Sequence, residues 1–234
     1  MSDLVVKTVE ELKDAPAEYR EAVSKLVISH AINELYGAQV FDEPAIAFAP
    51  TPYAKWLTCR VAMEEYGHHV RFKQLGQQIG IAEERMMPSA SKRPLSIFEF
   101  PLKTWEEFVA IKLLADLAEI LQVEDLLHCT FHPLRNAARA TMPEERFHAQ
   151  FGEDFSAELV KTPEGKAKLQ AAVNAYWPYL PSFFGGSKSR NNEIFRKWKI
   201  KQRSNDEMRE DYVKRATEVA AKYGLSLPPV QKVA

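Results

Sequence analysis

Apolar residues recur along most of the chain at intervals of three and four, which is the period of a helix buried on one side. No run alternates apolar and polar residues for long enough to predict a β-sheet. Prolines and glycines divide the periodic stretches into four long segments, at about 14–38, 53–79, 105–129 and 133–160. The sequence therefore predicts an all-α protein built on four long helices.

The connections between these helices differ in length and composition. The segment 42–52 contains three prolines and is expected to be a loop. The segment 87–104 is rich in Pro, Ser and basic residues and is expected to be a long crossover. Two shorter helices follow at about 164–177 and 205–223, with a loop at 181–192 between them.

At 234 residues the chain is long enough to bury a sizeable core. We predict one domain over residues 1–234, with a bundle core at about 17–160 and a C-terminal helical segment at about 161–228. The 31 basic residues nearly balance the 32 acidic ones, which argues against a general nucleic-acid binder. No long uninterrupted apolar stretch or secretory leader is evident. We expect a cytoplasmic, soluble protein that binds neither nucleic acid nor membrane.

Two five-residue words, 80 residues apart, nearly repeat each other: Glu-Glu-Tyr-Gly-His at 64–68 and Glu-Glu-Arg-Phe-His at 144–148. In each word a glutamate precedes a histidine by three positions, so the two side chains share one face of a helix. An acidic residue set in apolar sequence lies about 30 residues upstream of each word, at Glu34 and Asp116. Two such pairs, with one acid from each of two other helices, form the ligand set of ferritin-like di-metal carboxylate proteins. The pattern predicts a ferritin-like four-helix bundle with additional C-terminal helices and a di-metal centre inside it.

The choice of ligands leaves some alternatives open. Each word contains two glutamates, and the E-x-x-H arrangement selects the second, with the first, Glu64 or Glu144, on roughly the same face. On the third helix Glu119 lies one turn after Asp116 and remains an alternative to it. His30 either bonds a ligand carboxylate or is a core histidine, whereas His69 points about 100° away from its neighbour in the first word. The predicted ligands are one acid from each of two helices and the two E-x-x-H pairs: Glu34, Glu65, His68, Asp116, Glu145 and His148.

The composition of this ligand set favours particular metals. Carboxylates dominate, histidines are few and no thiolate takes part, which suits iron, with manganese as the alternative. The two cysteines, Cys59 and Cys129, have no CxxC partner and are expected to be free thiols. Pro143 directly precedes the second word inside a predicted helix, so we expect a kink or a local bulge beside the centre.

Further strings carry a resemblance to a known family. They fall in the family's order along the chain: Ser29–Glu34, Glu64–His68, Ser96–Pro101, Leu114–Asp116, Glu144–His148 and Trp198–Lys201, followed by Asn205-Asp206-Glu207. On these strings, over about residues 19–228, the chain resembles the catalytic subunits of the phenylacetic acid catabolic family. The family has an aspartate at the position of Asp116, so the resemblance favours Asp116 over Glu119.

The resemblance implies an activity and its partners. Catalytic subunits of this family are ferritin-like di-iron monooxygenases that insert one oxygen atom from O2 into the ring of an aromatic acyl-CoA such as phenylacetyl-CoA. Electrons from NADPH are expected through a separate flavin and iron–sulfur reductase, and a noncatalytic sister subunit is an expected partner. A homo-oligomer is one of the assemblies considered. The alternatives are a ferritin-like ferroxidase that handles iron, or a noncatalytic subunit of a multicomponent oxygenase.

The resemblance also implies roles for individual residues. The four carboxylates Glu34, Glu65, Asp116 and Glu145 would be catalytic as ligands of the two irons, with Glu65 and Glu145 as bridges. The basic run at 196–203 would lie with the crossover near the CoA phosphates. The residues implied for binding the acyl-CoA come from the first helix, the crossover and this basic run: Lys25, Arg93, Ser96, Lys199 and Lys201.

Overall fold

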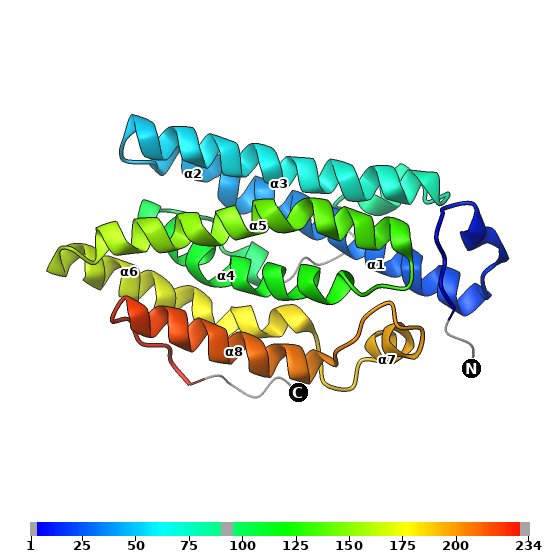
Figure 1. Cartoon of the computed structure of the whole chain (residues 1–234). Helices are drawn as coiled ribbons and strands as arrows, with labels where there is room; N and C mark the ends of the chain where they lie inside the picture. The colour runs from blue at the N-terminus through cyan, green and yellow to red at the C-terminus, as the bar shows by residue number, and fades with distance from the viewer. Residues whose placement is uncertain (1–3, 90–95, 230–234) are drawn as a thin grey trace.

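The computed structural model describes residues 4–89 and 96–229, and these residues are helical apart from turns, loops and one bridge between Val6 and Phe131. Helix α3 packs along α1, and α4 packs along α5, so that two helix pairs lie side by side (Figure 1). The four long helices of the bundle are α1 (Ala17–Gly37), α3 (Pro52–Gln78), α4 (Trp105–Leu126) and α5 (His132–Leu159). The predicted all-α four-helix bundle is confirmed.

Helix α4 is the most deeply buried element of the bundle. It packs on α5 on one side, and two C-terminal helices, α6 (Pro163–Tyr176) and α8 (Asn205–Lys222), cover it from the other (Figure 1). Its sequence is apolar almost all round, as expected of a helix with no solvent face. Lys112 and Asp116 are buried exceptions to this rule.

Local sequence signals explain where the helices begin. Thr51 caps α3 by accepting a hydrogen bond from the backbone N–H of Ala54 at 3.1 Å. Thr104 opens α4 and Ser204 opens α8, each in a capping box with a glutamate three residues later. These caps fix the residue at which each helix begins, and thereby the position along the bundle axis at which its side chains enter the core.

The predicted loop at 42–52 is wrong for most of its length. Helix α1 continues through a π-helical segment, Ala38–Asp42, into α2 (Glu43–Phe48). Pro44 lies in the first turn of α2, directly after the π-helical segment. The π-helical turn places Asp42 in the interior, at 1% exposure.

Two further boundaries differ from the predictions. Part of the predicted loop at 181–192 is helical, because a 3-10 helix covers Trp177–Phe184 and α7 (Arg190–Lys197) begins after the cap Ser189. The prediction at Pro143 was a kink or a local bulge; helix α5 runs through Pro143 with no bulge, and the kink stays a prediction. Pro143 and the residue four before it are exposed, so the carbonyl that loses its helical partner faces water.

No helix in the described part of the chain is long and apolar enough to cross a membrane.

Candidate metal centre

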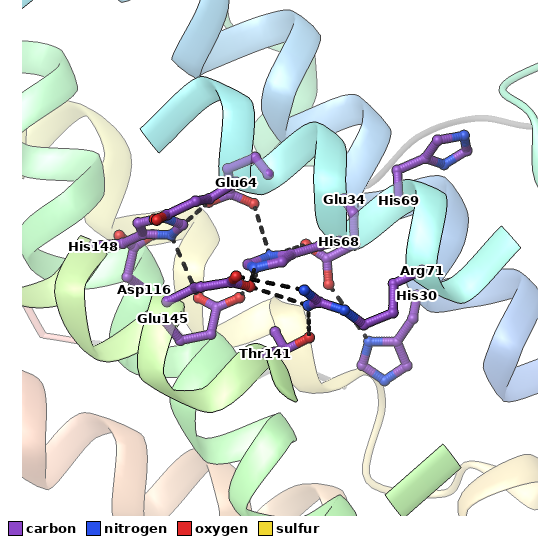
Figure 2. Close-up of polar contacts among 12 residues, drawn as sticks. His30, Glu34, Glu64, His68, His69, Arg71, Asp116, Thr141, Glu145 and His148 are labelled. Atoms are coloured by element: carbon purple, nitrogen blue, oxygen red, sulfur yellow. Dashed lines mark hydrogen bonds and ion pairs between the residues drawn. The ribbon is translucent and has the colours of Figure 1, made fainter. Parts of the chain in front are cut away.

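Side chains from all four bundle helices meet in the middle of the molecule. His68 of α3 and His148 of α5 enter from opposite helix pairs, and their ring centroids lie 5.7 Å apart (Figure 2). Both imidazoles are completely buried, and Glu145 and Asp116 lie beside them. The two words that nearly repeat in sequence therefore face each other in space.

Two carboxylates connect the histidines. Glu65 places Oε2 at 3.6 Å from Nδ1 of His68 and Oε1 at 3.1 Å from Nδ1 of His148. Glu145 places Oε1 at 3.1 Å from Nδ1 of His68 and Oε2 at 3.9 Å from Nδ1 of His148. Each carboxylate thus offers one oxygen to each histidine, which is the arrangement needed to bridge two cations.

The remaining predicted ligands lie on opposite sides of this pair. Glu34 places Oε2 at 3.6 Å from Nδ1 of His68, and we call this half of the centre the α1 side. There, ligand atoms of Glu34, Glu65, His68 and Glu145 all lie within 4.8 Å of one another. Asp116 lies on α4 toward His148, and we call that half the α4 side.

The first glutamate of each word bonds the histidine of the other word. His68 donates from Nε2 to Glu144 at 2.8 Å, and His148 donates from Nε2 to Glu64 at 2.9 Å. Because a carboxylate only accepts hydrogen bonds, each Nε2 carries the proton and each Nδ1 is left to face the centre. Arg71 in turn donates to Glu144 at 3.0 Å (Figure 2). The alternative ligands Glu64 and Glu144 therefore orient the histidines from behind, whereas Glu119 lies near His30 and Glu34.

Several buried atoms at the centre make no hydrogen bond of acceptable geometry in the described part of the chain. They are Nδ1 of His68, Nδ1 of His148, Oδ2 of Asp116 and both carboxylate oxygens of Glu145. Buried polar atoms without partners are costly, and all of these atoms point toward the same region. A mixed set of oxygen and imidazole donors is suited to iron or manganese. The residues present fit a pair of metal ions.

The pKa values of these groups reflect concentrated negative charge. Burial raises the pKa of Asp116 and of Glu145. Burial opposes the charging of His148, yet its hydrogen bond with Glu64 and its contact with Glu65 raise its pKa to about 10. The centre therefore favours bound cations, whether protons or metal ions.

A buried lysine in this centre was not predicted from the sequence. Nζ of Lys112 lies 2.9 Å from Glu65, 3.4 Å from Asp116 and 2.8 Å from Asp42. One signal was present, because Lys112 stands four residues before Asp116 in an otherwise apolar helix, where an unpaired ammonium would be unstable. Asp42 could not be placed, because its π-helical turn was taken for a loop.

Two histidines near the centre have separate surroundings. Nδ1 of His69 bonds the backbone carbonyl of Ala31 at 2.7 Å, so His69 is a core histidine outside the centre. His30 stacks on Phe72 with centroids 4.9 Å apart and lies 3.9 Å from Glu34. His30 thus contacts a predicted ligand from outside the pair of imidazoles.

Two cavities connect the centre with the surface. An outer cavity of about 240 Å³ has mostly polar walls that include Lys25, Ser29, Gln122, Asn192, Lys201 and Asn205. A small inner cavity of about 40 Å³ touches Glu65 and Asp116 and is otherwise largely apolar, with Ile97 and Phe98 in its wall. Asn33, Glu119 and Phe183 line both cavities, so they form the partition between them.

The residues implied for acyl-CoA binding are only partly brought together. Lys25 and Lys201 line the outer cavity, and Lys201 is almost fully buried and donates to Gln122. Ser96 begins the short helix Ser96–Glu99, whose next two residues line the inner cavity. Lys199 has a positive φ of 52°, and its carbonyl accepts a hydrogen bond from Thr130. Arg93 lies outside the described residues.

Comparisons with known proteins agree with this geometry. The model of the family described as phenylacetic acid catabolic protein matches residues 1–234. The chain belongs to this family. Over 219 residues it is 27% identical to a protein of Escherichia coli (strain K12) that is named as one of the subunits of 1,2-phenylacetyl-CoA epoxidase. The alignment covers 91% of this chain and 71% of that protein.

One solved structure shows the same fold for this member of the phenylacetic acid catabolic family. Protein 19 with aldehyde deformylating oxidase activity from Synechococcus matches with a TM-score of 0.67 at 17% identity, over 90% of this chain and 93% of that one. The fold is a ferritin-like bundle with additional C-terminal helices, as predicted from the sequence.

Proposed function

We propose that this family member is a di-iron oxygenase that uses O2 to epoxidise or hydroxylate an aromatic acyl-CoA such as phenylacetyl-CoA. The observation that carries the proposal is the buried pair of E-x-x-H motifs, whose carboxylates each face both histidines, beside a cavity that opens outward. The similarity to a protein named for 1,2-phenylacetyl-CoA epoxidase supports this substrate class. Manganese is the alternative metal.

In this proposal the residues of the centre have two roles, holding the ions and orienting the histidines. When bound, the two ions supply the activation of O2, which no side chain can perform. Glu34 and His68 would hold one ion and Asp116 and His148 the other, with Glu65 and Glu145 between them. The crossed glutamates hold each imidazole in the tautomer and direction that a ligand needs.

The outer cavity suits the polar end of an acyl-CoA, and the inner cavity marks the path of the aromatic end to the centre. The ammonium groups of Lys25 and Lys201 in the outer cavity would attract phosphate groups, with Asn side chains nearby as hydrogen-bond partners. The inner cavity lies against the centre, where the buried Ile97 and the half-buried Phe98 exclude water; at about 40 Å³ it is smaller than an aromatic ring, so the ring would enter only as side chains of its wall move aside. Phe183, in the partition, would contact the ring on entry.

The proposal includes partner proteins. The bacterial relative is named as one of several subunits, which indicates a multicomponent enzyme. We infer that this chain works with a noncatalytic sister subunit. Its electrons would come from NADPH through a separate flavin and iron–sulfur reductase.

Metal analysis combined with acyl-CoA binding tests the proposal. Protein reconstituted with Fe(II) without oxygen is expected to retain two irons per chain and to bind phenylacetyl-CoA more tightly than acetyl-CoA. Glu65→Ala is expected to lose iron while keeping its helical circular dichroism, because the carboxylate that faces both histidines is gone. Unchanged iron content in Glu65→Ala would contradict the ligand assignment. Fe(II) oxidation without acyl-CoA binding would instead support an iron-handling protein, and no iron retention a noncatalytic subunit.

A further inference from the structure

The two sides of the metal centre differ in their relation to Lys112. Oε1 of Glu65 lies 3.1 Å from Nδ1 of His148 and 2.9 Å from Nζ of Lys112. The same ammonium lies 3.4 Å from Oδ1 of Asp116. The ammonium therefore contacts two of the ligands that an ion on the α4 side would use.

The α1 side is arranged for an ion that shares only one of its ligands, Glu65, with the Lys112 ammonium. Glu34, Glu65, His68 and Glu145 bring one ligand atom each to within 4.8 Å of one another. Neither Asp116 nor His148 belongs to this closely spaced set. The α1 side thus has a compact group of four donors. On the α4 side, Glu65 and Asp116 already contact the Lys112 ammonium.

Lys112 also contacts a third carboxylate, Asp42. Asp42 lies 2.8 Å from its ammonium and is not one of the six predicted ligands. Both residues also line the inner cavity, which gives the flexible lysine side chain space beside the centre. The repulsion between an ammonium and a divalent ion a few ångströms away is strong in a buried site. An ion that binds Glu65 and Asp116 would therefore drive Lys112 away from them while its contact with Asp42 remains.

We propose that the Lys112 ammonium holds the place of a metal ion on the α4 side, so that the two ions bind in order. The first ion binds on the α1 side, and the second binds only as Lys112 moves from Glu65 and Asp116 toward Asp42. The proposal rests on the proposed function only for the statement that metal binds at this centre.

Titration with Mn²⁺ alone tests the order of binding. Calorimetry on the wild-type chain is expected to resolve two steps, with the second at least tenfold weaker than the first. In the double variant Lys112→Met/Asp42→Asn, which removes the ammonium together with its counter-charge, the second step is expected to tighten at least tenfold. Electron paramagnetic resonance should then show the spin-coupled Mn²⁺ pair at lower added metal. An unchanged or weaker second step in this variant would overturn the proposal.

The single variant Asp42→Asn has the opposite expected effect. It keeps the ammonium and removes the group that receives it, so the second step should weaken while the first is unchanged. It also serves as the measurable variant if the double variant fails to fold, which circular dichroism would show. A second step that Asp42→Asn leaves as tight as in the wild type would overturn the proposal. Lys73→Met is the control and should leave both steps unchanged, because it removes another lysine that pairs with a carboxylate, Glu83 at 3.1 Å, away from the centre and from both cavities.

The outcomes separate this proposal from the proposed function. Ordered binding of two Mn²⁺ ions without phenylacetyl-CoA binding would sink the oxygenase assignment and leave the role of Lys112 standing. Two Mn²⁺ ions bound with equal affinity, together with phenylacetyl-CoA binding, would overturn the role of Lys112 and leave the oxygenase assignment standing.

A second feature, independent of the metal centre, is an apolar stripe on the outer face of α3. Tyr53, Trp56, Met63 and Val70 are exposed by 64%, 62%, 67% and 42%. With Arg60 and Gly67 between them, their spacing alternates between three and four residues, which is the spacing of a coiled-coil seam. Helix α3 forms an outer edge of the molecule (Figure 1).

The stripe can pack against the same stripe of a second copy that runs in the opposite direction. In an antiparallel pair of α3 helices, Trp56 would lie opposite Gly67 of the partner subunit, and Tyr53 opposite Val70 of the partner subunit. Nothing lies within 4 Å of the place where a Cβ of Gly67 would be, which leaves room for an indole. Arg60 stacks on Phe147 at 3.6 Å, so its charge is turned back onto its own chain. A twofold pair buries the same patch on both copies.

We infer that a second copy of this chain covers the α3 stripe. Light scattering is expected to show a dimer for the wild type and a monomer for Trp56→Glu, while Val5→Glu, a matched change at another exposed apolar residue, keeps the dimer. Cys59 is exposed on α3 and Cys129 is buried, so a short bis-maleimide should link two wild-type chains through Cys59. A wild-type monomer, a dimer that survives Trp56→Glu, or association only with a sister subunit would overturn the inference.

Discussion

At the scale of single residues, the adjacent glutamates of each word have different surroundings. Successive helical residues point about 100° apart, so Glu64 and Glu65 cannot both face the same ion squarely. Glu65 faces the two imidazoles across the centre, whereas Glu64 reaches the outer nitrogen of His148. The sequence was sufficient to predict Glu65 as the glutamate that faces the histidine of its own word, because its i, i+3 relation to that histidine is local. The crossing to the other word depends on how α3 and α5 approach each other, which no local pattern encodes.

Glu144→Gln tests the crossed contact. The amide loses the negative charge that holds Nε2–H of His68, so the affinity for metal is expected to fall about 10- to 100-fold. The dissociation constant for Mn²⁺, measured by calorimetry, reports the change. Glu153→Gln is the control, since Glu153 pairs with Lys222 and Tyr223 away from the centre. Equal affinities in the two variants would show that the contact does not support the site.

Lys201 gives a prediction about pH. Burial lowers the pKa of its ammonium to about 8, so the side chain loses its charge as the pH rises through that value. An anionic ligand in the outer cavity prefers the charged form, and the affinity for phenylacetyl-CoA is therefore expected to fall from below to above pH 8. Lys201→Met should bind more weakly and show no such fall across this range. A variant that keeps the wild-type pH dependence would assign the effect to another group.

At the scale of elements, sequence periodicity located the long helices within a few residues. It failed at short elements, because the π-helical turn and α2 together span too few residues for a period to appear. It also gave no information about helix crossings. At Gly152, one turn after His148, a Cβ would lie 2.4 Å from the backbone N of Leu113 and 2.7 Å from the carbonyl O of Lys112. This glycine lets α5 approach α4 closely beside the metal centre.

Gly152→Ala is expected to force α4 and α5 apart. The backbone atoms it would meet cannot turn away as a flexible side chain can, so we expect a loss of about 1–3 kcal/mol in the free energy of unfolding. Urea denaturation followed by circular dichroism measures this loss. Gly37→Ala is the control, because nothing lies within 4 Å of its Cβ position, and it is expected to gain up to about 1 kcal/mol. A stable Gly152→Ala protein would mean that the crossing can widen freely.

At the scale of the whole molecule, the C-terminal helices form part of the wall of the bundle. The hydroxyl of Tyr212, on α8, donates to the backbone carbonyl of Leu114 at 3.1 Å, and its ring is fully buried. Arg203, just before α8, donates to the carbonyl of Leu121 at 2.8 Å. Residues of α6 and α8 belong to the same apolar cluster as the middle of α4. The C-terminal helices thus pack on the bundle, whereas the sequence alone could place them only after it; that the chain is a single domain stays a prediction.

Tyr212→Ala tests whether the chain unfolds as one unit. Removing the buried ring is expected to cost about 3–5 kcal/mol, since it leaves a cavity between α8 and α4. If α8 and the bundle form one cooperative unit, hydrogen exchange by global opening will accelerate by the same factor in α8, α4 and α5. Glu218→Ala, at an exposed position on α8, is the control and should change little. Faster exchange confined to α8 would show instead that the C-terminal helices open independently, and that the centre on α4 and α5 keeps its fold without them.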